Sequence, residues 1–401
     1  MRVVSGMIRL RTPLDIDIYS AEGKLLLTKG VIIRDLYKLE QIFNSKCYTT
    51  PFGENQPRFD DSSLEQRFAT QYIENLIVRL EIAYSNLVKD GYNLVRDIAD
   101  LADEIIHELD ADPDMFIGLV HLRADLNHAI MRTIQNTIFA ILTARRLEWG
   151  TTRVKSLACA GLTQNLGLYP LQIDLVKLQN HELSSFHRQQ IRLHTKQSSK
   201  MLISMGVRDR CWINAVTFHH ERLDGSGYPM AMTAKDIPSE ARLMAIVDRY
   251  GSMITPRTYR DAGNPTEVMR KLLVSKGKQY DKQLSQALIA ELGIYPPGTT
   301  VELASGEIAI VTKRSNDRLK PVVAAIWDKN DECHVHPVER DTSDPAYKIL
   351  SIKRHKRTQK LNADLFWGDS ANDLENQPLF RIDERPQISM EDEHDSEVTL
   401  F

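Results

Sequence analysis

The strongest constraint on the fold is a long stretch of helical periodicity in the middle of the chain. From residue 63 to about residue 109, apolar residues recur every three or four positions without a single proline, a pattern that predicts long amphipathic helices. Segments of globular helix length, such as SEARLMAIVDRYGSMI, follow from about residue 113 to residue 293. The fold class is therefore expected to be mainly α, with an all-α core. The first helices are expected either to link two modules or pair in a homodimer, or else to pack against the next domain.

The two ends of the chain have a different pattern. Short leucine-rich and β-branched runs followed by the helical segment RDLYKLEQIF predict a small α+β module over residues 1–57. Turns alternating with β-branched runs in TTVELASGEIAIVTKR and KPVVAAIW predict a β-rich extension over residues 296–357. Between them, the helical connector is assigned to residues 62–112 and the helical domain to residues 113–295. The acidic, aperiodic remainder, residues 358–401, is expected to be disordered.

Composition excludes several function classes. The net charge of −3 differs from the strongly basic charge that is typical of nucleic-acid-binding proteins. No apolar run approaches the ~18 residues that a membrane helix needs, and no signal peptide is apparent. We therefore expect a cytoplasmic protein that contacts neither membrane nor nucleic acid. Four cysteines lie far apart without metal-ligand spacing, which indicates reduced thiols. They are Cys47, Cys159, Cys211 and Cys333.

The segment HHERLDGSGYP is the most distinctive motif in the chain. Its first two residues are His219 and His220. In one interpretation, one of these side chains faces the core and the other faces solvent. In the other, both turn toward a metal at a helix end, because neutral imidazole is the commonest side-chain metal ligand. The residues after them predict a rigid turn. This turn is either purely structural or presents a tyrosine to a protein partner. The turn residues are Asp224, Gly225, Gly227, Tyr228 and Pro229.

Two further residues belong with the histidine pair. His194 lies in the helical segment RLHTKQSSKML, and Asp248 lies inside an apolar helical stretch, where a carboxylate needs a partner. Three histidines and an aspartate on successive helices can converge on one point of a bundle. Such a donor set suits iron, manganese or zinc better than calcium or magnesium.

At this point the chain resembles the HD-GYP domains, a branch of the HD superfamily of metal-dependent phosphohydrolases. HHERLDGSGYP fits the HHExxDGxGYP signature of that family without a gap, and HTKQSSKML and IPSEARLMAIVDRYGSMITPRTYR stand where two further family helices belong. The resemblance covers roughly residues 113–293. It implies an HD-type helical bundle and bacterial cyclic di-GMP signalling, with hydrolysis of that dinucleotide at a centre of two or three metals. It also implies docking of the turn to other signalling proteins, such as GGDEF cyclases.

The resemblance also implies roles for individual residues. His194, His219, His220 and Asp248 match metal-ligand positions. Two basic residues after the aspartate helix are similar to the family's phosphate-facing pair, although a solvated helix end is the alternative. They are Arg257 and Arg260.

The chain departs from the family at its name-giving His-Asp dyad. The corresponding segment is GLTQNLGL, with Gln164 and Asn165 at the dyad positions, and Arg132 stands where an earlier family histidine belongs. His128, one helical turn away, is the alternative ligand. Asparagine is neutral and cannot bridge two metals as a carboxylate does.

We therefore expect at most one divalent metal, iron or manganese, with the Arg132 guanidinium in the place of the second. Hydrolysis is expected to be weak or absent, so a dinucleotide-binding or protein-docking effector is preferred. The alternatives are an active phosphodiesterase with a rebuilt centre, and a dimeric scaffold that binds no nucleotide.

Overall fold

The computed structural model describes the helical middle of the chain and the segment after it almost completely. The described residues are 14, 16–19, 25–31, 69–88, 93–122, 128–171, 184–255, 263–274, 279–353, 358 and 361–367. Of the predicted N-terminal module, they include one antiparallel pair, β1 (Ile18–Tyr19) with β2 (Leu25–Leu27). The helix predicted from RDLYKLEQIF lies outside the described residues, as do residues 368–401 of the predicted disordered tail. The start of that tail was wrongly placed at residue 358: η6 (Ala363–Leu365) is a short 3₁₀ helix, and the Trp367 side chain is only 3% exposed because it packs into the core of the helices.

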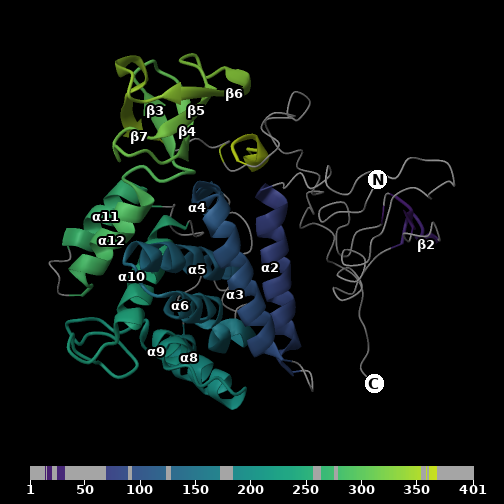
Figure 1. The fold of residues 1–401 in the computed structure, drawn as a ribbon, viewed down its shortest axis with the longest axis vertical. Helices are drawn as coiled ribbons and strands as arrows, with labels where there is room; N and C mark the ends of the chain where they lie inside the picture. The colour runs from purple at the N-terminus through teal and green to yellow at the C-terminus, as the bar shows by residue number, and fades with distance from the viewer. Residues whose placement is uncertain are drawn as a thin grey trace.

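The middle of the chain is all-α, which confirms the predicted fold class (Figure 1). The α-helices are α2 (Ala69–Ser85), α3 (Leu94–Ala111), α4 (Pro113–Leu122), α5 (His128–Arg146), α6 (Thr151–Thr163), α8 (Ser185–Ser204), α9 (Arg210–Phe218), α10 (Ser239–Ile254), α11 (Pro265–Val274) and α12 (Lys282–Leu292). A 3₁₀ segment, η3 (Leu166–Leu171), follows α6. Several helices begin where a side chain accepts a backbone N–H of the first turn, as Ser184, Asp209 and Asp281 do for α8, α9 and α12.

The helices predicted as a connector share one hydrophobic core with the later helices. On α3, the buried residues Leu94, Ile98, Leu101 and Ile105 recur at helical spacing, and α3 packs against α2, α5 and α6. The hydroxyl of Tyr84 at the end of α2 donates a hydrogen bond to the carbonyl of a residue in α6. Packing against the next domain, one of the two expected arrangements, is therefore what these helices do.

A small antiparallel sheet follows the helices and confirms the β-rich extension (Figure 1). Its strand order is β6-β5-β4-β3-β7. The strands are β3 (Thr300–Leu303), β4 (Ile308–Lys313), β5 (Val322–Trp327), β6 (Cys333–Asp341) and β7 (Ile349–Ile352). One face has its own apolar cluster, whereas Ile310, Ile326 and Trp327 join the core of the helices. Arg314, after β4, forms ion pairs with Asp114 of α4 and with a glutamate of α12. These ion pairs also hold the sheet against the helices.

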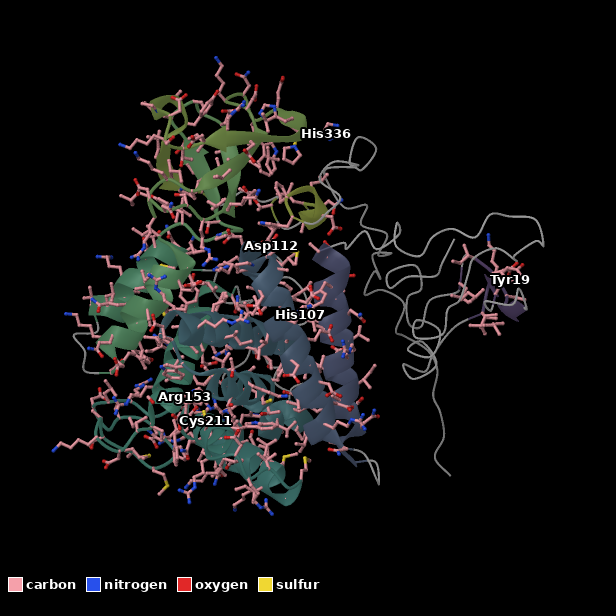
Figure 2. All side chains as sticks on the ribbon, viewed as in Figure 1. Tyr19, His107, Asp112, Arg153, Cys211 and His336 are labelled. Carbon is pink, nitrogen blue, oxygen red and sulfur yellow. The ribbon has the colours of Figure 1, made fainter. Side chains whose placement is uncertain are left out.

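Helices α6, α9 and α10 are held together at the lower end of the helical domain. There Arg153 of α6 and Cys211 of α9 lie close together (Figure 2), and the guanidinium of Arg153 lies 3.1 Å from the carboxylate of Glu240 on α10. Cys159, Cys211 and Cys333 are free thiols, as predicted, and Cys47 lies outside the described residues. None of the described helices combines the length and apolar character needed to cross a membrane.

Candidate metal centre

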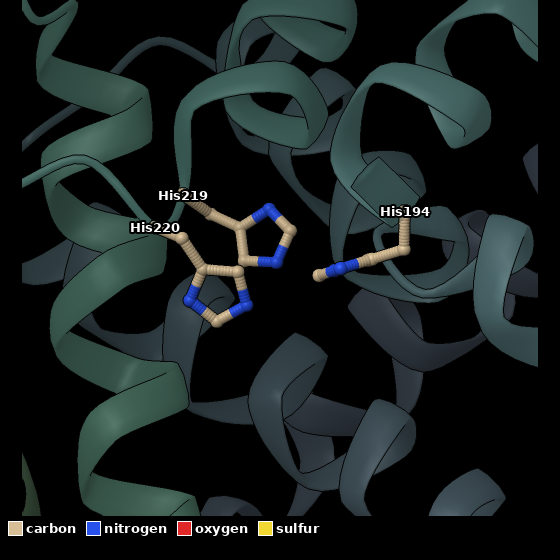
Figure 3. A group of neighbouring side chains, drawn as sticks. All are labelled: His194, His219 and His220. Carbon is tan, nitrogen blue, oxygen red and sulfur yellow. The ribbon is translucent and has the colours of Figure 1, made fainter. Parts of the chain in front are cut away.

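Three histidines from two helices meet in the interior of the helical domain (Figure 3). His194 lies in the middle of α8, His219 is the C-terminal capping residue of α9, and His220 follows directly. One ligand atom from each ring lies within 4.8 Å of the other two. The α9 helix ends at the pair, so both adjacent imidazoles turn toward His194, which is the arrangement that the metal interpretation requires.

The hydrogen bonds of two histidines fix which ring nitrogen is free. The Nδ1 of His194 lies 2.5 Å from the carbonyl oxygen of Ile191, and the Nδ1 of His219 lies 2.8 Å from that of Val216. Each Nδ1–H therefore donates, which leaves the Nε2 lone pair available. Both Nε2 atoms are buried and have no hydrogen-bond partner among the described residues. Buried polar atoms without partners are rare in folded proteins, and these two suit a bound metal ion.

Burial keeps the three imidazoles neutral near pH 7. It lowers the pKa of His194 to about 3, with the neighbouring His219 adding to the effect. The pKa values of His219 and His220 are also lowered, again chiefly by burial. Because only neutral imidazole ligates a metal, the cluster is prepared to bind one at neutral pH.

Asp248 lies beside the cluster, but one oxygen of its carboxylate is bound by two other side chains. Its Oδ1 lies 2.7 Å from Nη2 of Arg132 and accepts a 3.0 Å hydrogen bond from Nδ2 of Asn136, both on α5. Burial would raise the pKa of Asp248, but the guanidinium and the nearby His219 and His220 hold it well below its usual range. Among the described residues, the group with all ligand atoms within 4.8 Å of one another contains the three histidines and not Asp248.

The two dyad positions lie in the turn between α6 and η3. Gln164 is fully buried, and neither atom of its side-chain amide has a hydrogen-bond partner among the described residues. Its backbone carbonyl accepts a 3.1 Å hydrogen bond from Ser198, one turn after His194 on α8. Asn165 is half-buried. The turn thus packs against the helix that carries His194, with neutral amide side chains at both positions.

The turn after the histidine pair is fixed by its own contacts. The Glu221 carboxylate accepts hydrogen bonds from the backbone N–H groups of Met230 and Met232, at 2.6 and 2.9 Å. Gly225 has a φ of +75°, a conformation that favours glycine. At Gly227, a Cβ would lie only 2.4 Å from the nearest backbone atom, so a side chain does not fit.

Tyr228 joins this turn to the histidine cluster. Its ring stacks on that of His220 with centroids 4.8 Å apart, and its backbone N–H donates to the His220 carbonyl at 3.2 Å. The tyrosine is half-buried rather than exposed. The prominent apolar side chain on the surface of the turn is Met230, which is 60% exposed.

Sequence reasoning missed two residues of the site, Asn136 and Glu221. Each could have been found from the sequence. Asn136 lies one helical turn after Arg132, and Glu221 is the glutamate of the HHExxD signature. Arg257 and Arg260 lie outside the described residues. His128 begins α5, but its side chain also lies outside the described part of the structure.

Comparison with known proteins agrees with this geometry. Residues 117–284 match the family model described as HD domain. A cyclic di-GMP phosphodiesterase of Pseudomonas aeruginosa is 28% identical over 216 residues, which are 54% of this chain and 52% of that protein. A probable cyclic di-GMP phosphodiesterase of Vibrio cholerae is 38% identical over 73 residues, 18% of this chain and 17% of that protein. The chain thus spans about half the length of the first of these relatives and less of the second.

The chain also resembles a solved structure. An HDG"Y"P protein from Bdellovibrio bacteriovorus aligns with 72% of this chain and 97% of that chain, at 15% identity and with a TM-score of 0.36.

The helical domain and its histidine cluster define an HD domain protein, as the family match over residues 117–284 shows. The HHERLDGSGYP signature narrows the class further: the chain is an HD-GYP domain protein.

Proposed function

We propose that this HD-GYP domain binds cyclic di-GMP beside a single divalent metal, iron or manganese, and hydrolyses it weakly or not at all. The observation that carries the proposal is the state of Asp248, whose Oδ1 is paired with the Arg132 guanidinium at 2.7 Å. The choice of ligand is supported by the relatives, which are named as cyclic di-GMP phosphodiesterases.

The physical argument begins with charge. Two-metal hydrolysis uses dications ~3.5 to 4 Å apart, which polarise the phosphate and stabilise both the attacking and the leaving oxygen. Holding two dications so close requires bridging negative charge, and Gln164 and Asn165 supply none. Arg132 adds a permanent positive charge next to Asp248. A second dication would have to displace that guanidinium from a buried carboxylate.

The three imidazoles remain suited to one metal. His194, His219 and His220 would hold it, and it would supply a positive charge for a phosphodiester. Nucleotide binding does not require a second metal, because phosphate is also recognised by guanidinium groups. We include Arg257 and Arg260 in this proposal as further phosphate contacts.

The turn from Asp224 to Pro229 is proposed as a docking surface for cyclic di-GMP signalling proteins, such as GGDEF cyclases. Its shape is fixed by hydrogen bonds, and the neighbouring Met230 is 60% exposed. A preformed surface binds with less loss of conformational entropy than a loop that must order on binding.

The test is hydrolysis of cyclic di-GMP by purified protein loaded anaerobically with iron or manganese. A His219→Ala/His220→Ala double variant is the control, and ligand affinity is measured in parallel by calorimetry. We expect binding by the wild type and no turnover above that of the double variant. Turnover that disappears in the double variant would establish the active phosphodiesterase instead, with Asn165 or His128 completing its centre. Absence of nucleotide binding would favour the dimeric scaffold.

A further inference from the structure

An exposed arginine lies at the entrance to the histidine cluster, outside the signature motif. Arg192 is two residues before His194 on α8, and its guanidinium lies over the ring of Tyr228, 5.5 Å from the centroid. The same ring also stacks on that of His220, with centroids 4.8 Å apart. A continuous row of Arg192, Tyr228 and His220 therefore leads from the surface to the proposed metal ligands.

The charges around Tyr228 leave Arg192 without an acidic partner among the described residues. The charged groups that act on the tyrosine hydroxyl are Asp248, Arg192, Arg132 and Arg222. The carboxylate of Asp248 is already paired with Arg132, and Arg222 lies near Asp224. The remaining acid close by, Glu221, accepts two backbone N–H groups of its own turn. Counted over the described residues alone, the groups around Tyr228 thus carry an excess of positive charge, and Arg192 is the arginine among them that has no acidic partner.

We propose that Arg192 binds one phosphodiester of the cyclic dinucleotide while the other phosphodiester lies over the histidine cluster. The inference rests on the proposed function and adds a second phosphate subsite to it. A guanidinium that stacks on an aromatic ring keeps the N–H donors of its edge free, and their fork matches two phosphate oxygens. Tyr228 acts as a positioning residue that holds the guanidinium by cation–π attraction.

This arrangement selects for a ligand with two phosphodiesters. A cyclic dinucleotide reaches both subsites, whereas cyclic GMP, with one phosphate, reaches only one. We therefore expect cyclic di-GMP to bind at least about 10-fold more tightly than cyclic GMP, since a hydrogen-bonded pair of charges contributes more than a neutral hydrogen bond.

The experiment measures dissociation constants of the full chain, loaded with manganese, for cyclic di-GMP and cyclic GMP at two salt concentrations. Arg192→Ala is expected to weaken cyclic di-GMP binding about 10- to 100-fold, to leave cyclic GMP binding nearly unchanged, and to reduce the salt dependence. Arg192→Lys keeps the charge but loses the planar fork, so it is expected to recover part of the affinity. Manganese affinity, measured separately, is expected to stay at the wild-type value.

Arg210→Ala is the matched control. Arg210 is also an exposed arginine, at the first residue of α9, at the opposite end of that helix from His219. Its loss changes the net charge by the same amount and is expected to change affinity less than about two-fold, because surface charges at a distance are screened by salt.

Two results would overturn the inference in distinguishable ways. If the wild type binds cyclic di-GMP and Arg192→Ala binds it within two-fold as tightly, the second phosphate subsite is wrong and the proposed function stands. If the wild type binds no cyclic dinucleotide at all, both are wrong.

Discussion

The ion pair between Arg132 and Asp248 is the feature on which the account depends, and its removal has a calculable cost. In Arg132→Met, a side chain of similar length loses the charge, and the Asp248 carboxylate keeps the neutral Asn136 amide at 3.0 Å. Breaking a buried pair in this way costs about 3 to 5 kcal/mol. Because the Arg132 side chain is 23% exposed and that of Asp248 10% exposed, water screens part of the interaction, and we expect about 3 kcal/mol, the lower end of that range.

The pH dependence of this loss provides a second signature. In the wild type, the pKa of Asp248 is held below its usual range, so the pair stabilises the fold above about pH 4 and the stabilisation is lost as the pH falls. Without the guanidinium, burial raises the pKa of the carboxyl group. The stability deficit of the variant relative to the wild type should therefore be larger at neutral pH than at about pH 4, where the carboxyl group of the unfolded chain becomes protonated.

The assay is urea unfolding of the metal-free protein followed by circular dichroism, with Lys155→Met as the control. Lys155 pairs with Asp103 at 2.6 Å, but the two side chains are 43% and 56% exposed, so its loss should cost less than about 1 kcal/mol. An Arg132→Met variant as stable as this control, with no pH-dependent deficit, would refute the buried ion pair.

Three further predictions test the surrounding structure by the same unfolding assay, and one of them, with its control, also by metal affinity. Gly227→Ala would place a Cβ 2.4 Å from the backbone nitrogen of Arg222 and should cost about 1 to 3 kcal/mol and weaken metal binding. Gly150→Ala, where a Cβ meets nothing within 4 Å, should leave metal affinity unchanged. Burial lowers the pKa of His121 to about 4, so on acidification the unfolded chain takes up a proton at this residue before the folded chain does. His121 should therefore contribute about 2 kcal/mol to the fall in stability from pH 7 to pH 5, in addition to the contribution of the histidine cluster, and His121→Phe should remove that component. Trp367→Ala, at a side chain only 3% exposed, should cost about 3 to 5 kcal/mol; a loss below 1 kcal/mol would show that the segment after the sheet does not pack on the core.

The helices and strands were largely predictable because their patterns are local. The spacing of Leu94, Ile98, Leu101 and Ile105 predicts the buried face of α3, and the structure buries all four. The sequence left open whether the helices before residue 112 stand apart or pack on the domain. That outcome depends on contacts between segments far apart in the chain, such as Tyr84 with α6, which no local pattern encodes.

The histidine cluster was predictable, but the surroundings of Asp248 were only partly so. A metal-binding motif implies convergence of His194, His219 and His220, and their ligand atoms do converge within 4.8 Å. The position of Arg132 indicated a cation at the site, and the structure places it on Asp248. The hydrogen bond from Asn136 joins residues 112 positions apart and follows from how α5 packs on α10, which only the folded structure defines.

The most direct test of the central claim is the number of metal ions bound per chain. Purified protein would be loaded anaerobically with excess manganese or iron, freed of unbound metal by gel filtration, and measured by elemental analysis. The account predicts one ion per chain in the wild type and none in His219→Ala/His220→Ala. Two ions per chain in the wild type would contradict it, because a second dication would then occupy the site assigned to the Arg132 guanidinium.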